Sequence, residues 1–334
     1  MFHRRAHTHQ PADNPLMHVI QRWSPKTVGL VAAVITVLIW TGFIIIARAS
    51  VRGTLTPFDI ALARIVGASL VLVPLGAWLV RRDRAGAMGE SSLFGLSPLP
   101  LRATALCGVF GGSTYAALAY SGFAYAPAAH ASVLMPGSLP LWTALLAVPL
   151  LGLRITAVRA LGLALIVVGD LLVGGASLLH ALDGGEVWKG DLLFMATSMS
   201  WAVYSVLARR YALDAVRAVV AITVFALLSY VPLYGLLLLT GVLHSQLLSA
   251  PLSEVLFQMG FQGLGSVVIS GITFTRMVQH FGPVRSTMIT ALVPGLSALA
   301  AVFFLDEPLY WNLLAGLALV TAGILFGVRK SKAP

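Results

Sequence analysis

The sequence carries few charges. Only 10% of its 334 residues are Asp, Glu, Lys or Arg, and 58% are hydrophobic. Soluble domains usually carry about 25% charged residues, and the mean hydropathy here is +0.90. A chain this apolar cannot cover itself with a polar surface in water. The composition therefore excludes an ordinary soluble protein and predicts a chain that is solvated by the lipid bilayer.

Cysteine and the motifs of several enzyme classes are also scarce. Cys107 is the single cysteine and lies in an apolar stretch, which excludes an internal disulfide and is typical of a packing residue. The phosphate-binding motif G-x-x-x-x-G-K-S/T is absent, which argues against an ATP-driven pump. His3, His7 and His9 lie on a polar tail without a second-shell partner, so no metal and no cofactor are expected.

What the sequence does contain is a series of ten apolar stretches. Each is about 19–25 residues long, and a helix needs about 20 residues to cross the hydrocarbon. In lipid the backbone must satisfy its own hydrogen bonds, so the stretches are predicted to be helices. They lie near residues 28–48, 57–80, 103–124, 130–151, 157–176, 190–208, 216–240, 255–279, 284–305 and 310–328.

The stretches form two copies. At an offset of 161 positions, Trp40, Ala47 and Arg48 recur as Trp201, Ala208 and Arg209. At an offset of 154, Pro140, Gly162 and Gly169 recur as Pro294, Gly316 and Gly323. An odd number of spans per copy forces the second copy to insert with the opposite orientation. The predicted fold is an all-α polytopic membrane protein with ten transmembrane helices as two inverted five-helix repeats, an architecture typical of secondary transporters.

The predicted organisation has five parts. Residues 1–27 form a cytoplasmic N-terminal tail and residues 28–176 form the first five-helix repeat. An outer connecting loop, 177–189, leads to the second repeat, 190–328. A basic cytoplasmic tail, 329–334, ends the chain.

The distribution of Lys and Arg predicts the orientation. With the N-terminus inside, 17 of these residues fall on the cytoplasmic side, and only Arg48, Arg52 and Lys189 fall outside. Cytoplasmic loops of membrane proteins carry such an excess. The chain is therefore expected to lie in the plasma (inner) membrane with both termini cytoplasmic. The net charge of +10 is explained by topology and indicates no nucleic-acid partner.

Short motifs follow one another in a characteristic order along residues 28–328. They are Trp40-Thr41-Gly42, Pro57 followed by Arg64, Gly190-Asp191-Leu192-Leu193 through Trp201 and Arg209, Pro294 followed by Asp306-Glu307, and Gly316 with Gly323. The pattern resembles the drug/metabolite transporter superfamily, in particular its EamA-type ten-helix members. The resemblance implies a transporter of small metabolites, often an exporter. In one departure, Leu153 stands where the first repeat should carry a glutamate equivalent to Glu307.

Charged residues inside the spans are candidates for contact with a solute, because each costs about 2.5–3.5 kcal/mol to insert. Arg64 and Asp170 lie about 10 and 9 Å from the outer ends of their helices, by the helical rise. We expect them to face each other or to share a polar cavity; a static ion pair that only orients helices is an equal alternative. Arg276 lies near a cytoplasmic helix end, where it can reach water.

Aromatic and polar residues add further candidates. Trp40, Tyr115 and Tyr120 fall in the same slab as Arg64, and rings beside a cation suit a small organic solute with a carboxylate. Tyr120 has the alternative of an interfacial aromatic belt. A polar stripe at four-residue spacing either lines the pathway or hydrogen-bonds a neighbouring helix. The candidates of the second half are Trp201, Tyr204, Gln258, Gln262 and Ser266, with Ser270 continuing the stripe.

Two prolines mark matching places in the two halves. Pro140 and Pro294 each fall near the middle of a predicted span, where proline frees a carbonyl and kinks the helix. Paired interruptions of this kind indicate a transporter's central site. The alternative is a packing kink without solute contact.

Together these features predict a secondary transporter that exports amino acids or related small metabolites by alternating access. Its partner is a small-molecule solute. Coupling to protons through Asp170 is open, and facilitated diffusion is favoured if Asp170 is locked to Arg64. Both a monomer and a dimer are compatible with the sequence. The alternatives are efflux of lipophilic cations, against which the lack of a carboxylate in 28–48 counts, and a membrane enzyme or scaffold.

Overall fold

The computed structural model describes residues 24–85, 91–180, 185–290, 292–308 and 310–328. Within these ranges every predicted apolar stretch is helical and no β-strand forms. Most of the predicted N-terminal tail (1–23), part of the outer connecting loop (181–184) and the basic tail (329–334) lie outside the described residues.

The helices agree with the predicted stretches to within a few residues, but several stretches are divided. The helices of the first half are α2 (Pro25–Ser50), α3 (Pro57–Ala85), α4 (Leu101–Gly108), α5 (Thr114–Tyr125), α6 (Ala128–Ser132), α7 (Leu139–Leu151) and α8 (Ala157–His180). Those of the second half are α9 (Val187–Arg210), α10 (Ala215–Leu239), α11 (Leu252–Gln258), α12 (Ser270–Phe281), α13 (Pro283–Ile289), α14 (Leu292–Leu305) and α15 (Trp311–Val328).

Wider π-helical turns divide three of the spans. They are η1 (Val109–Ser113), η2 (Val133–Gly137) and η4 (Met259–Ile269). π-Helical turns often mark functional sites, because they shift the register of side chains along a helix. The turns η1 and η2 join the helices on either side of them without a gap or with one residue between, so each divided span still runs as one helical rod.

Seven helical segments of the described residues are long and apolar enough to cross a membrane. They are Lys26–Ser50, Pro57–Ala85, Ala128–Leu151, Val187–Arg210, Ala215–Leu239, Leu252–Phe281 and Pro283–Leu305. A shorter apolar helix covers Trp311–Phe326. The chain is thus a multi-pass helical membrane protein, while the count of ten spans stays a prediction.

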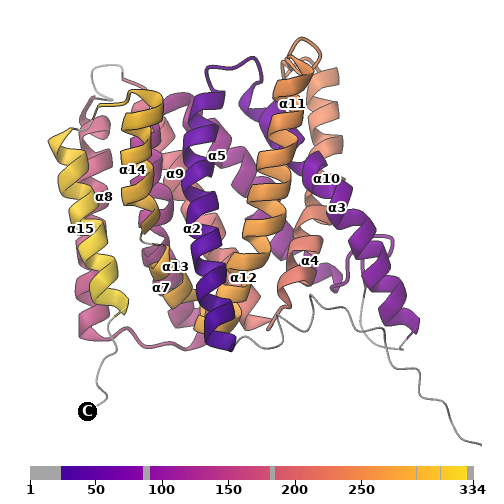
Figure 1. The fold of residues 1–334 in the computed structure, drawn as a ribbon, viewed down its shortest axis with the longest axis horizontal. Helices are drawn as coiled ribbons and strands as arrows, with labels where there is room; N and C mark the ends of the chain where they lie inside the picture. Colours follow the sequence, from indigo (N-terminus) through magenta and orange to yellow (C-terminus); the bar gives the residue numbers. More distant parts are fainter. Residues whose placement is uncertain (1–23, 86–90, 181–184, 291, 309, 329–334) are drawn as a thin grey trace, which may run out of the picture.

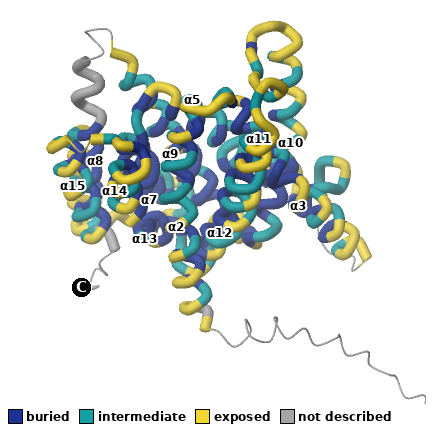
Figure 2. The backbone as a smooth tube through the Cα atoms, turned by 45° about the horizontal axis from the view of Figure 1, so that its top comes forward, coloured by how far each residue is buried: buried dark blue, intermediate teal, exposed yellow. Residues whose placement is uncertain are grey.

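The surface of the bundle is apolar where it would meet lipid. On α2, Leu30, Val34 and Leu38 recur every four residues and are all exposed, so one face of this helix presents only aliphatic side chains. Exposed Leu299 and Phe303 give α14 a similar face. Polar side chains lie inside instead, and buried residues gather in the middle of the bundle (Figure 2). This arrangement fits a hydrocarbon solvent.

The two halves interlock through their first helices. Helix α2 packs against α12 and α14 of the second half, and α9 packs against α5 and α7 of the first half. The helices run between two ends of the bundle (Figure 1). We call them the Arg48 end, where α2, α5, α10 and α14 finish, and the Arg209 end, where α3, α7, α9 and α12 finish.

Helices α8 and α15 form a closely packed pair at one edge of the bundle (Figure 1). A Cβ on Gly316 would lie 2.7 Å from the Gly169 carbonyl oxygen, and one on Gly323 would lie 2.5 Å from the Gly162 carbonyl oxygen. Both distances are too short for any side chain. The glycines that recur in the two halves therefore permit backbone contact between the last helices of the halves.

Candidate functional site

The centre of the bundle is a cluster of aromatic rings from both halves. The rings of Trp40 on α2 and Trp201 on α9 meet edge to face, with centroids 5.9 Å apart and planes at 77°. Phe274 stacks on Trp40 at 5.1 Å, and Tyr115 and Tyr204 each lie 5.0 Å from Trp201. These spacings are typical of favourable aromatic contacts. The structure thus brings together four of the predicted residues, Trp40, Tyr115, Trp201 and Tyr204.

Two small hollows meet at Trp201, which lines both. Each has a volume of about 30 Å³, room for little more than a water molecule. The first pocket is lined by Trp40, Phe43, Ile44, Tyr115, Met135, Pro136, Leu139, Thr197, Ser198, Trp201 and Val293. The second pocket includes Arg64, Ala68, Gly111, Trp201, Tyr204, Thr223 and Ser266. Solute sites usually measure about 300–1,000 Å³, so neither hollow has room for such a solute in this structure.

Arg64 is buried in the second pocket without a carboxylate partner. It lies on α3 and is only 7% exposed. Its Cζ atom is 5.6 Å from the ring centroids of both Phe43 and Tyr115, and the Tyr120 hydroxyl interacts with it. No Asp or Glu of the described residues lies within 4.0 Å of its guanidinium group. Because buried charges are normally paired, this guanidinium is suited to binding an anion.

Other polar groups beside Arg64 also lack partners. The hydroxyls of Thr223 and Ser266 line the second pocket, and both are buried without a hydrogen-bond partner among the described residues. The indole N–H of Trp201 is also buried without a hydrogen-bond partner among the described residues. Buried polar groups are nearly always satisfied, so three unsatisfied groups around one cation define a place where a polar ligand would gain hydrogen bonds.

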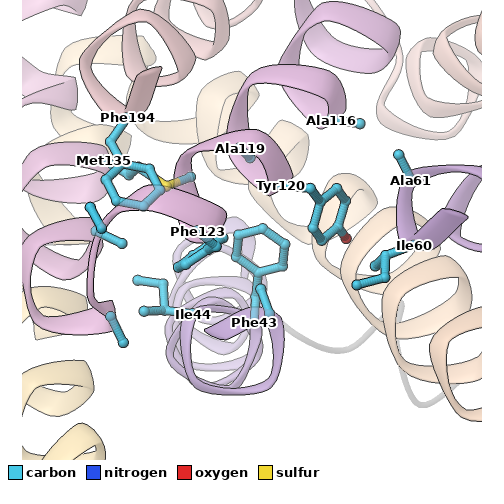
Figure 3. Packing of buried hydrophobic residues seen from close by; sticks show 14 of the residues in the cluster. Phe43, Ile44, Ile60, Ala61, Ala116, Ala119, Tyr120, Phe123, Met135 and Phe194 are labelled. Carbon is cyan, nitrogen blue, oxygen red and sulfur yellow. The ribbon is translucent and has the colours of Figure 1, made fainter. Parts of the chain in front are cut away.

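Tyr120 lies inside the protein and not in an aromatic belt at the membrane surface. It is 2% exposed, and its ring centroid lies 6.0 Å from that of Phe43. Figure 3 shows it between α5 and α3, with Phe43 of α2 on one side and Ile60 of α3 on the other. The interfacial alternative for Tyr120 is therefore wrong, because α5 turns this residue toward α2 and α3.

The expected pairing of Arg64 with Asp170 is wrong. Asp170 is buried on α8, which packs mainly on α15 and also on α9, η2 and α7, not on α3. Both of its carboxylate oxygens lack a hydrogen-bond partner among the described residues, and Asp170 lines neither central pocket. The two residues share a depth, but depth along a helix does not fix the position of that helix around the bundle.

The polar stripe is buried along its whole length, from α11 through η4 to α12. The Gln258 amide nitrogen donates to the Ser50 hydroxyl at 2.6 Å, whereas both amide atoms of Gln262 lack a hydrogen-bond partner among the described residues. Ser266 lines the second pocket and Ser270 donates to the Ser266 carbonyl at 2.7 Å. Residues spaced four apart shift gradually around the surface of an α-helix, which has about 3.6 residues per turn. The wider π turns of η4 oppose this shift, so the stripe stays on one face. Gln258 thus hydrogen-bonds a neighbouring helix, as one alternative expected, whereas a pathway role for the rest of the stripe stays a prediction.

The two mid-span prolines occupy matching places. Pro140 lies in the first turn of α7, directly after η2, and Pro294 lies in the first turn of α14, after the end of α13. A Cβ on Gly137, at the end of η2, would lie 3.8 Å from the Pro294 ring, so the two interruptions are neighbours. Pro136, four residues before Pro140, and Val293, directly before Pro294, line the first pocket. Pro140 and Pro294 themselves do not line it.

Sequence reasoning missed three residues of the centre. Phe43 lines the first pocket, Phe274 stacks on Trp40, and Thr223 lines the second pocket. The position of Phe43, three residues after Trp40 and so on the same helix face, was a usable signal. A single phenylalanine or threonine in an apolar span carries no such signal, because most of these residues only pack.

Polar contacts close the bundle at the Arg48 end. The Arg48 Nε atom lies 3.1 Å from the Glu307 carboxylate, and Arg48 Nη1 donates to the Phe123 carbonyl at 2.9 Å. Nearby, the His130 Nδ1 and Asp191 Oδ1 atoms lie 2.9 Å apart, which ties α6 to α9. No group of three or more His, Cys, Asp or Glu in the described part of the chain is placed to hold a metal ion.

These features define a class: multi-pass helical membrane proteins with aromatic and polar residues at the centre, between two interlocked halves, as in membrane transporters. The chain belongs to the EamA-like transporter family, which matches residues 27–175 and 188–329. It is 25% identical over 226 residues to "Uncharacterized transporter YyaM" of Bacillus subtilis (strain 168), covering 66% of this chain and 70% of the relative. A solved structure titled "Crystal structure of protein" shares the fold, with TM-score 0.56, 23% identity, and coverage of 92% of this chain and 98% of the other.

Proposed function

We propose that this transporter is a secondary carrier that exports small carboxylate-bearing metabolites, such as amino acids, by alternating access. The observation that carries the proposal is Arg64, a buried guanidinium without a carboxylate partner among the described residues. A carboxylate from the solute would complete a charge-assisted pair with it. The same charge would repel a lipophilic cation, which counts against drug efflux of that kind.

We assign the solute a place between the two halves. Its carboxylate would meet Arg64 and the hydroxyls of Ser266 and Thr223 in the second pocket. Its apolar part would lie against Trp40 and Tyr115 in the first pocket, with Trp201 between them. Because each pocket has a volume of only about 30 Å³, binding requires that Trp201 and its helix move to join them.

We also propose that ten helices span the membrane as inverted repeats, 28–176 and 190–328, about the loop 177–189. The seven apolar spans would be joined by Leu101–Tyr125, Ala157–His180 and Trp311–Val328. Matching contacts support the inversion: Arg48 Nη1 donates to the Phe123 carbonyl, and Arg209 Nη1 donates to the Gln279 carbonyl. The two contacts lie at opposite ends of the bundle (Figure 1).

The first test is uptake by proteoliposomes that contain the purified full-length chain. Wild type and the variants Arg64→Ala and Arg64→Lys are offered a pool of labelled amino acids and small carboxylates. We expect Arg64→Ala to lower uptake roughly 10- to 100-fold, since a hydrogen bond to a charged group contributes about 1.5–3 kcal/mol. Arg64→Lys should retain part of the uptake, because it keeps the charge but not the planar fork.

The matched control is Arg276→Ala, which removes an exposed arginine of α12 that lines neither pocket. It should leave uptake near the wild-type level. Uptake that survives Arg64→Ala would contradict the proposed solute site while leaving a carrier. No uptake of any carboxylate by correctly inserted wild type would contradict the proposed solute class.

A further inference from the structure

The two halves end their fourth spans with the same backbone turn. After α7, Gly152 is left-handed at φ 66°, and the Leu153 N–H donates to the Ala147 carbonyl at 3.3 Å. After α14, Asp306 is left-handed at φ 54°, and the Glu307 N–H donates to the Ala301 carbonyl at 3.3 Å. Positions 153 and 307 are therefore equivalent in structure, although one is leucine and the other is glutamate.

Glu307, just after α14, binds two other segments at once at the Arg48 end. Its carboxylate pairs with Arg48 of α2 at 3.1 Å, and it accepts the backbone N–H groups of Ala128 and Ala129 at 3.2 Å each. Arg48 in turn holds the Phe123 carbonyl at the end of α5. One carboxylate thus connects the end of α14 with α2 and with the start of α6. Charge-assisted hydrogen bonds of this kind are about twice as strong as neutral ones.

This contact lies one helical turn along α2 from the first central pocket and lines a second hollow. Ile44, one helical turn before Arg48 on α2, lines the first central pocket. Arg48 and Glu307 line a larger hollow of about 330 Å³ at the Arg48 end, together with Arg52 and His130. Along α2, the ion pair at Arg48 therefore lies between Ile44, which lines the central pocket, and Arg52, which lines the outer hollow.

The corresponding place at the Arg209 end lacks the carboxylate. Within the described part of the chain, Arg209 Nη1 donates to the Gln279 carbonyl alone, at 3.2 Å. Val284 and Arg285 follow Pro283 as Ala128 and Ala129 follow Pro127, but no side chain of the described residues accepts a hydrogen bond from their N–H groups. Leu153, at the position of the missing glutamate, is 40% exposed.

We propose that the Arg48–Glu307 pair is the gate at the Arg48 end, and that its absence at the other end makes the Arg209 end open more readily. The resting carrier then presents its site at the Arg209 end, where the solute is loaded, and solute binding drives the opening of the charged gate. The inference rests on the proposed carrier function and adds to it the end at which the site is open when no solute is bound. Contacts that hold the Arg48 end shut stabilise the state that is open at the Arg209 end. Because the Arg209 end lacks equivalent contacts, this state is the more populated of the two.

The test uses two reporter cysteines at equivalent positions and needs no solute. In a Cys107→Ala background, Ala301→Cys places a thiol below the gate at the Arg48 end, and Ala147→Cys places one at the Arg209 end. Both alanines are 1% exposed and accept the equivalent turn hydrogen bond. The rate of modification by a small hydrophilic methanethiosulfonate is measured on the purified full chain in lipid nanodiscs. We expect Ala147→Cys to react faster than Ala301→Cys.

Three further variants test whether the gate causes the difference between the two modification rates. Glu307→Gln should raise the Ala301→Cys rate on the order of tenfold, because it removes the ion pair but keeps the side chain's size. Leu153→Glu should lower the Ala147→Cys rate, since it supplies the missing acceptor. Glu254→Gln is the matched control: Glu254 also accepts backbone N–H groups at the Arg48 end, from Thr54 and Leu55, but lines neither central pocket. It should change neither rate.

The outcomes separate the gate from the carrier function. Equal reporter rates, or an Ala301→Cys rate that Glu307→Gln leaves unchanged in a stably folded variant, would overturn the gate even if uptake is observed. The expected rates would uphold the gate even if every carboxylate offered in the uptake experiment fails. If Glu307→Gln does not fold, the slower Ala147→Cys reaction in Leu153→Glu still decides the question.

Discussion

At the scale of single residues, Arg64 and Asp170 are opposite charges in different surroundings. Arg64 has rings, hydroxyls and a pocket beside it, whereas Asp170 has two buried oxygens without partners among the described residues and no pocket. Burying an unpaired charge in an apolar interior costs desolvation free energy unless a neighbouring hydrogen bond or ion pair compensates for it. For Arg64, a bound solute carboxylate would offset this cost. Asp170 has no such partner in the closed structure.

We therefore predict that Asp170→Asn leaves the thermal unfolding midpoint unchanged or raises it. The amide has the same size and carries no charge, so it removes the penalty without leaving a cavity. A static ion pair would behave in the opposite way, because breaking a buried pair costs about 3–5 kcal/mol. The measurement is tryptophan-fluorescence unfolding of both proteins in the same detergent. A fall of the midpoint by several degrees would show that Asp170 has a cationic partner.

The pair also shows what sequence can and cannot predict about a site. Helical rise predicts the depth of each residue, and Tyr115 does lie with Trp40 in the first pocket and beside Arg64. It gives no information on which helices are neighbours, and α8 lies with α15, away from α3. Glu307 was recognised by its position at a helix end, but its partner Arg48, 259 residues earlier in the chain, follows only from tertiary packing.

At the scale of elements, the apolar stretches predicted the helices closely, because lipid forces every spanning segment to satisfy its own backbone. The π turns η1, η2 and η4 were not predicted. They depend on how a helix fits its neighbours: Gly67 and Gly263 lie where α3 and η4 approach within backbone contact distance. The recurring glycines Gly169 and Gly316 were seen in the sequence, and only the structure shows that they face each other.

We predict that Gly316→Ala destabilises the protein by about 1–3 kcal/mol through overpacking. The added Cβ would lie 2.5 Å from a methyl carbon of Val173 and 2.7 Å from the Gly169 carbonyl oxygen, so α8 and α15 must separate. Gly295→Ala on α14 is the control, because nothing lies within 4 Å of its added Cβ. There alanine should be neutral or slightly stabilising in a helix. Urea or thermal unfolding compares the two, and equal stability would contradict close α8–α15 packing.

At the scale of the whole molecule, the two ends differ in charge as well as in their gates. The Arg209 end carries Arg81, Arg82 and Arg84 in the last turns of α3, Arg154 after α7 and Arg210 at the end of α9, whereas the Arg48 end carries Arg48, Arg52 and Lys189 among several carboxylates. Basic residues are retained on the cytoplasmic side during insertion. The end that lacks the Glu307-type gate is therefore the one expected to face the cytoplasm, where an exporter meets its solute.

This orientation can be tested on intact cells with two exposed reporter positions. Leu248, between α10 and α11, is fully exposed at the Arg48 end, and Phe94, between α3 and α4, is 93% exposed at the Arg209 end. In the Cys107→Ala background, a membrane-impermeant maleimide should label Leu248→Cys on intact cells and Phe94→Cys only after permeabilisation. The parent with Cys107 alone should stay unlabelled, because that thiol is buried. Labelling of Phe94→Cys from outside would invert the topology, and the end that opens at rest would then face away from the cytoplasm, as in an importer.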